Sequence, residues 1–228
     1  MVISKVLNNL HLGRDRLNLL PPWLIKLGFH LLYNQMAWSY DLVAWSVSFG
    51  QWAAWRRLAL LFLQPGPILE LAYGTGGLMA DMLEAGHQPV GIDFSPYMAR
   101  LARRRLQRQN VPIALNRAKA QALPFPSNYF SNVVATFPTN YIFEPQTLAE
   151  VYRVLKAPGG RLVIVVEGKL RGPWPIRPMI DWLYKITDQH NFPAIKPLPL
   201  FEKHDFKARW EKVEHEGVQA RLLIVDKD

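Results

Sequence analysis

The chain has 228 residues, half of them hydrophobic, and it contains no cysteine. This length suits one compact domain with an appendage and is too short for two ordinary enzyme domains; the lack of cysteine excludes disulfides, thiolate metal sites and cysteine nucleophiles. A formal net charge of +9 would attract nucleic acid, anionic lipid or an acidic substrate without choosing among them. The six histidines include no pair at the i, i+4 helical spacing that favours zinc, so we expect no metal.

The first part of the chain, residues 19–63, is apolar and rich in aromatic side chains. Charged residues interrupt it and leave charge-free runs of fourteen residues, short of the roughly 18 to 20 that span a bilayer. We expect two or three helices here, one near Trp23 and the last over residues 51–63, with breaks at Asn34 and Gly50. The N-terminus has no signal-peptide pattern, so we expect a cytoplasmic location.

After residue 67, apolar strand-like segments alternate with helix-like segments. We expect strands at 68–72, 89–93, 111–115, 131–137 and 161–166, and helices at 77–86, 95–109 and 145–155. This alternation predicts an α/β fold with a mostly parallel sheet and helices on both faces. Residues 206–215 and 218–225 flank Glu216-Gly217 and predict an antiparallel hairpin, which brings the sheet to seven strands.

Residues 167–201 form a proline-rich, aromatic insertion between the fifth and sixth strands, around an expected helix at 176–186. We therefore divide the chain into an N-terminal helical extension, residues 1–64, and a domain of residues 65–228 that contains the insertion, the two forming one structural unit. The extension and the insertion are expected to meet over the carboxyl ends of the strands as an apolar lid, where such folds bind ligands. Alternatively, their aromatic side chains bury one another as core.

A glycine turn follows the first strand, and Asp93 ends the second strand nineteen residues after Gly74. Glycines let the backbone turn tightly against a ligand, and a carboxylate at a strand end can hold ribose hydroxyls. A nicotinamide dinucleotide would need a further glycine three positions beyond Gly76, but Met79 stands there. The segment therefore predicts a nucleoside site that is not a dinucleotide site.

The segment resembles the first motif of the class I S-adenosylmethionine-dependent methyltransferases, an acidic-x-Gly-x-Gly-x-Gly pattern followed by an acidic residue at the next strand end. The matching positions are Glu70, Gly74, Gly76 and Asp93, and Ala72 replaces the first glycine. Later landmarks of the family match at residues 91–98, 122–126 and 150–160, so the resemblance covers about residues 66–166. The pair Tyr40-Asp41 is similar to a Tyr-Asp in the ubiquinone/menaquinone-methyltransferase-like branch (methyltransferase type 11).

The resemblance implies a Rossmann-like class I methyltransferase fold and S-adenosyl-L-methionine as cofactor. Glu70 would orient the loop and the cofactor's ammonium, Asp93 would accept both ribose hydroxyls, and Phe94 would pack on the adenine. As alternatives, Glu70 is a capping carboxylate, Asp93 a helix N-cap partner, and Phe94 and Met98 are core residues. The full implied cofactor set is Glu70, Ala72, Tyr73, Gly74, Gly76, Asp93, Phe94, Met98, Ala120, Gln121 and Phe137.

The sequence departs from the family at two positions of this site. Ala72 would cost about 1 to 2 kcal/mol if the position needs a left-handed backbone, and would be tolerated with extended dihedrals. Lys119 stands where the family carries an aspartate that accepts the adenine amino proton, and lysine has no acceptor. Gln121 or a backbone carbonyl could replace that acceptor, and Lys119 could turn to solvent.

The acceptor of the methyl group is less well specified. We expect a small hydrophobic or amphiphilic molecule, such as a quinone precursor, a lipid or an aromatic metabolite. Candidate residues to orient it or act as base are Tyr141, Asn140 and Tyr40, although a packed aromatic role suits Tyr141 as well. The alternative is a non-catalytic protein of this fold with weakened or lost cofactor binding that serves as a binding module.

The charge balance bears on macromolecular partners. The excess of Lys and Arg would allow peripheral contact with an anionic membrane surface. Nucleic acid is not an expected partner, because the chain lacks a separate RNA-binding motif and an Asn/Asp-Pro-Pro-Tyr signature after the fourth strand.

Overall fold

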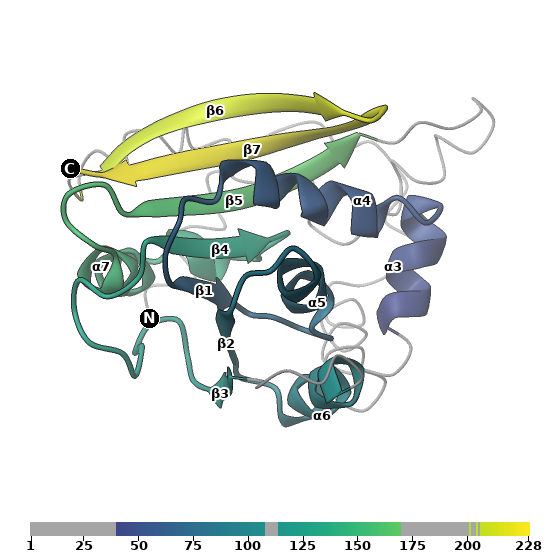
Figure 1. Ribbon diagram of the computed structural model, residues 1–228, viewed down its shortest axis with the longest axis horizontal. Helices are drawn as coiled ribbons and strands as arrows, with labels where there is room; N and C mark the ends of the chain where they lie inside the picture. Colours follow the sequence, from purple (N-terminus) through teal and green to yellow (C-terminus); the bar gives the residue numbers. More distant parts are fainter. Residues whose placement is uncertain (1–39, 108–113, 170–200, 202–203, 205) are drawn as a thin grey trace, which may run out of the picture.

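The computed structural model describes residues 40–107, 114–169, 201, 204 and 206–228. These residues build a seven-stranded sheet with the strand order β3-β2-β1-β4-β5-β7-β6 (Figure 1). The remaining residues, which include the expected helices near Trp23 and at 176–186, lie outside the described part of the chain.

Five parallel strands form the larger part of the sheet: β1 (Ile68–Leu71), β2 (Pro89–Asp93), β3 (Ala114–Arg117), β4 (Asn132–Thr136) and β5 (Arg161–Lys169). The expected strands are confirmed, although β3 runs two residues further than predicted and β5 three; the first residues predicted for β3, 111–113, lie outside the described part of the chain. Since β1 lies between β2 and β4, the chain reverses its direction of travel across the sheet at β1. Ligands of open α/β sheets bind at such a reversal, beyond the carboxyl ends of the strands.

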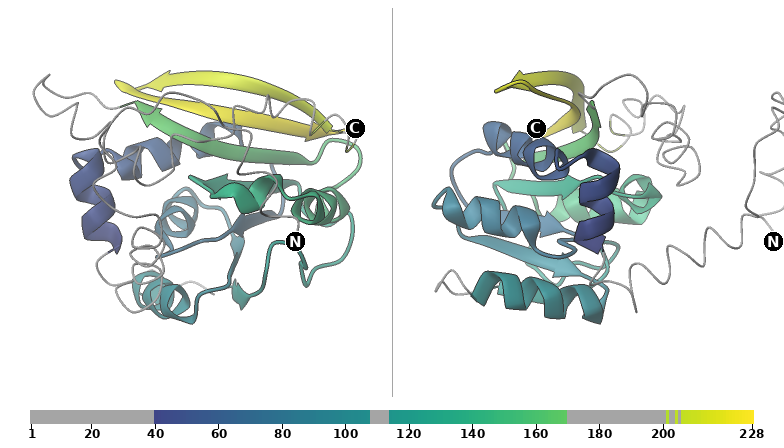
Figure 2. Two further views of the ribbon diagram at one scale, coloured as in Figure 1. Left: turned by 180° about the vertical axis from the view of Figure 1, so that it is seen from behind. Right: turned by 90° about the vertical axis from the view of Figure 1, so that its right-hand side faces the viewer.

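Helices cover both faces of the sheet (Figure 2). On one face, α5 (Gly77–Glu84) and α6 (Pro96–Leu106) pack in a buried cluster with Ile68, Val134 and Val163. On the other face, α7 (Pro145–Val154) packs in a second cluster with Leu69, Leu71 and Val133. Successive residues of β1 thus point to opposite buried faces, which explains the unbroken apolar character of the strand.

The C-terminal hairpin, β6 (Phe206–His215) and β7 (Val218–Lys227), completes the sheet as predicted, two residues longer than expected. Glu216 and Gly217 make its turn, both with positive φ, 47° and 77°. This is the pattern of a two-residue hairpin turn. β7 pairs antiparallel with β5, with a register shift between Val165 and Glu167.

Ahead of the sheet lie α3 (Tyr40–Ser48), α4 (Trp52–Arg57) and the 3-10 helix η2 (Leu58–Phe62). The expected break at Gly50 is confirmed by a positive φ of 77°. The prediction of one continuous helix over 51–63 is wrong, because its second half tightens into 3-10 geometry, which is common where a helix ends. Among the described residues, no helix is long and apolar enough to cross a membrane.

Helix α4 is held on the sheet by one close contact and one ion cluster. The ring of Trp55 is fully buried and lies against Gly168 of β5. The next two residues reach α5: Arg56 Nε donates to Asp81 at 2.6 Å and Arg57 Nε donates to the other carboxylate oxygen at 2.8 Å. Because Asp81 is almost fully buried, these charge-assisted bonds are well shielded from solvent on the carboxylate side.

We predict that Gly168→Ala destabilises the protein by about 2 kcal/mol, because the new Cβ would lie 1.9 Å from the nearest atom of the Trp55 ring. Urea unfolding measures this cost. In a Trp55→Leu background the smaller side chain leaves room, and the same substitution should cost much less. Equal costs in the two backgrounds would contradict this account of how α4 is docked.

Candidate active site

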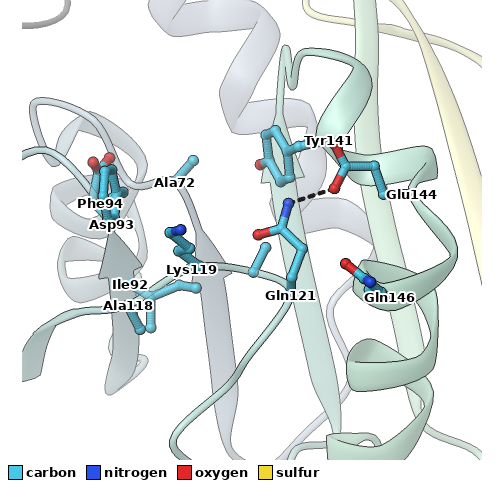
Figure 3. Close-up of a pocket in the computed structure, with 11 residues that line it drawn as sticks. Ala72, Ile92, Asp93, Phe94, Ala118, Lys119, Gln121, Tyr141, Glu144 and Gln146 are labelled. Atoms are coloured by element: carbon cyan, nitrogen blue, oxygen red, sulfur yellow. Dashed lines mark hydrogen bonds between the residues drawn. The ribbon is translucent and has the colours of Figure 1, made fainter. Parts of the chain in front are cut away.

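A cavity of about 470 Å³ lies beyond the carboxyl ends of β1, β2 and β3 (Figure 3). Its size falls within the range of small-molecule sites. One wall carries Asp93, Phe94 and Lys119, and the opposite wall carries Gln121, Tyr141 and Glu144 (Figure 3). The full lining is Ala72, Ile92, Asp93, Phe94, Ala118, Lys119, Ala120, Gln121, Tyr141, Glu144 and Gln146.

The glycine turn that connects β1 to α5 borders this cavity through its first residue. Gly74 and Gly76 both adopt positive φ, 56° and 75°, which glycine tolerates without strain. Gly76 also lies against α6, where an added Cβ would come within 2.9 Å of Ala102. The two glycines are therefore required by the backbone and by the close approach of α6.

Ala72 lines the cavity and has a φ of 53°. Of the two possibilities for this position, extended or left-handed, the structure shows the left-handed one. An L-residue with a Cβ is strained there by about 1 to 2 kcal/mol.

Asp93 ends β2 and fixes the shape of the turn. One carboxylate oxygen accepts the N–H of Gly74 at 2.9 Å, and the other accepts the N–H of Ser95 at 2.7 Å. Burial raises the pKa of Asp93, while the backbone donors act in the opposite direction. The N–H of Phe94 is a third backbone donor to this carboxylate. A carboxylate can accept about four hydrogen bonds, so Asp93 keeps an acceptor position for a ligand hydroxyl. Asp93 thus supports the start of α6 and also faces the cavity.

Phe94 follows Asp93 and exposes 58% of its surface, which is unusual for a phenylalanine in a folded domain. The Lys119 ammonium lies 5.3 Å from the centre of its ring, and the Arg117 guanidinium carbon lies 5.4 Å away. Lys119 lines the cavity and is also exposed to solvent (Figure 3). An exposed aromatic ring beside a carboxylate that can bind ribose hydroxyls is suited to stack on a flat base.

Glu70 is in a different environment from Asp93. Only 2% of Glu70 is exposed, it is absent from the cavity lining, and its Oε2 has no hydrogen-bond partner among the described residues. Burial raises its pKa well above the usual value, and the nearby Arg56 lowers it in part. The carboxyl group therefore lies behind the turn.

The other predicted cofactor residues divide between the cavity and the core. Ala120 and Gln121 line the cavity, whereas Met98 is buried and absent from the lining. Tyr73 packs on Gly91, and burial raises the pKa of its hydroxyl to about 12. Phe137, after β4, packs its ring on that of Trp52 at a centroid distance of 4.0 Å.

The three residues predicted to orient the methyl acceptor do not all line the cavity. Tyr141 lines the cavity, Asn140 is exposed and outside the lining, and the side chain of Tyr40 lies outside the described part of the chain. Beside Tyr141, Gln121 Nε2 donates to Glu144 Oε2 at 2.6 Å (Figure 3). No sequence signal selects Glu144, because it stands just before α7 and belongs to no recognised motif.

Asp41 of α3 contacts the glycine turn from outside the sheet. It accepts the hydroxyl of Thr75 at 2.7 Å and pairs with Arg105 of α6. Arg105 in turn donates to the carbonyl and the hydroxyl oxygens of Thr75 at 3.1 and 3.0 Å. Helix α3 is thereby joined to the glycine turn.

Comparison with known proteins agrees with this geometry. A family model described as a methyltransferase domain matches residues 68–160. The demethylmenaquinone methyltransferase of Thermus thermophilus is 38% identical over 170 residues, which are 72% of this chain and 74% of that protein. The chain belongs to the class I S-adenosylmethionine-dependent methyltransferases.

Further relatives lie in the same branch. The demethylmenaquinone methyltransferase of Deinococcus radiodurans is 34% identical over 73% of this chain and 69% of its own length. The ubiquinone/menaquinone biosynthesis C-methyltransferase of Yersinia enterocolitica is 32% identical over 71% of this chain and 64% of its own length. Because these relatives are named as methyltransferases, they do not favour the non-catalytic alternative.

Solved structures show the same fold. A putative methyltransferase from Methanococcus maripaludis aligns over 86% of this chain and 94% of its own, with a TM-score of 0.59 and 18% identity. A possible histamine N-methyltransferase from Thermotoga maritima aligns over 87% and 98%, with a TM-score of 0.60 and 18% identity.

The cofactor of this methyltransferase is S-adenosylmethionine, and the residues of the cavity fit it. The remaining acceptor position of Asp93 suits a ribose hydroxyl, and the exposed ring of Phe94 suits a base. Among the described residues, no group of three or more His, Asp or Glu side chains could hold a metal ion.

We predict that Ala72→Gly stabilises this methyltransferase by about 0.5 to 1 kcal/mol. Relief of about 1 to 2 kcal/mol of left-handed strain is partly offset by the extra freedom that glycine gives the unfolded chain. Ala118→Gly is the matched control, because Ala118 also lines the cavity but does not have a positive φ. Chemical unfolding should show a gain for the first variant and a loss for the second; a loss for both would disprove the strain.

We predict that ionisation of the buried Glu70 lowers the folding stability as pH rises. Its raised pKa means that the folded state holds the proton more tightly than the unfolded state, so stability is greatest below the ordinary glutamate pKa and is lost as pH rises through the folded-state value. Glu70→Gln carries no charge and lacks this dependence. Unfolding free energies from about pH 5 to about pH 8 should shift progressively in favour of the variant; parallel profiles would show that Glu70 is not the cause.

Proposed function

We propose that this methyltransferase acts on a lipophilic quinone-type acceptor and methylates a ring carbon. The printed names of the relatives support this proposal, since they act on demethylmenaquinone or serve ubiquinone and menaquinone biosynthesis as C-methyltransferases. The observation that carries the proposal is an exposed apolar face on α3, beside the cavity end of the sheet.

This face consists of Leu42, Trp45 and Phe49, which are 62, 61 and 45% exposed. Their spacing of three and four residues puts them on one side of α3 and the turn that follows it. Figure 1 shows α3 beyond the ends to which the arrowheads of β4 and β5 point. A lipophilic acceptor, or the membrane that contains it, would meet these side chains on its way to the site.

We assign roles within the site in the same proposal. Asp93 holds the ribose, Phe94 stacks on the base, and the turn from Ala72 to Gly76 borders the methionine portion. Tyr141 lies on the opposite wall and would orient the acceptor. When bound, the cofactor supplies a methyl group that an acceptor carbon takes by in-line displacement, with loss of a ring proton.

The protein's contribution is then mainly positioning and the exclusion of water. Asp41 would couple the N-terminal helices to the cofactor turn through Thr75, so that the acceptor side and the cofactor side are aligned together. We extend the same role to the N-terminal extension as a whole, residues 1–64, which would form the lid over the domain of residues 65–228. Contact with an anionic membrane surface follows from the same apolar face and the net positive charge.

The test is methyl transfer from radiolabelled S-adenosylmethionine to demethylmenaquinol in anionic phospholipid vesicles. We expect a methylated quinol in the organic phase, because the reduced ring is the electron-rich form that attacks a sulfonium methyl. Transfer to water-soluble phenols or amines without transfer to the quinol would disprove the acceptor class.

A surface variant tests the role of α3. Leu42→Ser with Trp45→Ser should raise the KM for the vesicle-bound acceptor by about tenfold, from the loss of apolar burial of about 1.5 to 3 kcal/mol, and leave cofactor binding unchanged. Leu61→Ser is the matched control: Leu61 is 52% exposed but lies on η2, which leads into the amino end of β1. Equal effects of the two variants would show that the α3 face has no special role.

A further inference from the structure

We infer that Lys119 determines how strictly the cofactor site selects its purine base, and that this site binds a 6-oxopurine nucleoside with an affinity similar to that for the 6-amino base of S-adenosylhomocysteine. The inference deepens the proposed placement of the ribose at Asp93 and the base on Phe94. It does not depend on the identity of the methyl acceptor.

Among the described residues that line the cavity, Lys119 is the cation that can reach the edge of a base. Its ammonium lies 5.3 Å from the centre of the Phe94 ring, so a base stacked on that ring would meet the ammonium at its edge or displace it sideways. The backbone of Lys119 is held in a tight turn, in which its carbonyl accepts the N–H of Ala122 at 3.1 Å. The side chain therefore extends from a fixed point into the cavity.

The second cation over the Phe94 ring is differently placed. Arg117 donates from Nε to the carbonyl oxygen of Phe94 at 3.1 Å and is absent from the cavity lining. It is committed to the backbone, whereas Lys119 lies within 4.0 Å of no carboxylate among the described residues. A ligand acceptor would give the Lys119 ammonium a partner inside the cavity.

The chemistry of the two bases then decides the preference. Lysine has three donors and no acceptor, so it cannot take the proton of a 6-amino group. An adenine offers a ring nitrogen beside that amino group, whereas a 6-oxopurine offers the oxygen and the adjacent N7 together, the pair that lysine contacts in guanine. Lys119 gains an acceptor with the oxo base and faces a like donor with the amino base.

Gln121, the candidate hydrogen-bond acceptor on the opposite wall, would favour adenine instead. The amide nitrogen of Gln121 is bound to Glu144, and its oxygen points into the cavity toward Lys119 (Figure 3). If this oxygen received the 6-amino proton, adenine would be strongly preferred. The relative affinity of the two nucleosides therefore distinguishes recognition by Lys119 from recognition by Gln121.

Isothermal titration of the full chain with S-adenosylhomocysteine and S-inosylhomocysteine tests the inference. We expect the wild-type dissociation constant of the inosine compound to be no more than about threefold above that of the adenosine compound, and Lys119→Met to move the ratio about tenfold toward adenosine. Lys119→Arg, which keeps a donor, should preserve the wild-type ratio. Arg117→Met is the matched control and should also leave it unchanged.

Three results would overturn the inference: a wild-type preference for adenosine of more than about threefold, a ratio that Lys119→Met does not change, or no binding of either nucleoside. The wild-type ratio decides even if a variant fails to fold. Asp93→Asn separates this inference from the proposed placement, because it should weaken both nucleosides equally. Unchanged binding in that variant would refute the placement itself, whereas loss of binding with no effect of Lys119 would refute only the inference.

Discussion

The hydrogen bond between the N–H of Gly74 and the carboxylate of Asp93 is the constraint on which the site depends. It joins the turn after β1 to the end of β2, so two adjacent strands deliver their loops to one place. The same carboxylate accepts the N–H of Ser95 at the start of α6. A single buried side chain thus fixes both the glycine turn and the start of a helix, and the backbone donors offset part of its desolvation.

The N-terminal helices are attached to this core at three points of different chemistry. Trp55 packs flush on Gly168, the arginines that follow it bind the buried carboxylate of Asp81, and Asp41 reaches Thr75 in the glycine turn. The first two contacts hold α4 on the sheet, and the third extends the attachment to the cofactor turn. A movement of α3 would therefore be transmitted to the glycine turn, and this bond is the physical basis of the proposed coupling between acceptor and cofactor.

The site combines stable support with local strain. Ala72 takes a left-handed backbone conformation at the point where β1 gives way to the turn, and Phe137 has a φ of 47° just after β4. Both positions lie at strand ends near the cavity end of the sheet, where the strongly paired strands can hold strained residues in place. The buried Glu70 adds a further cost behind the turn, because its carboxyl group lacks a full set of partners.

The sequence by itself determined the order of strands and helices, the glycine turn and the place of Asp93 at the end of the second strand. These features depend on periodicity, on glycine and on residues close in the chain, and such local rules do not need the tertiary fold. It also identified Ala72 and Lys119 as unusual.

Only the tertiary structure decided the conformation of Ala72, the direction of Lys119, and which implied site residues line the cavity. Met98 and Glu70 lie in motifs that match the family, yet the packing of α5 and α6 buries them behind the turn. Glu144 reaches the opposite wall only because α7 follows β4 across the sheet. Contacts between residues far apart in sequence are set by how the layers pack, so the sequence pattern of a single segment does not predict them.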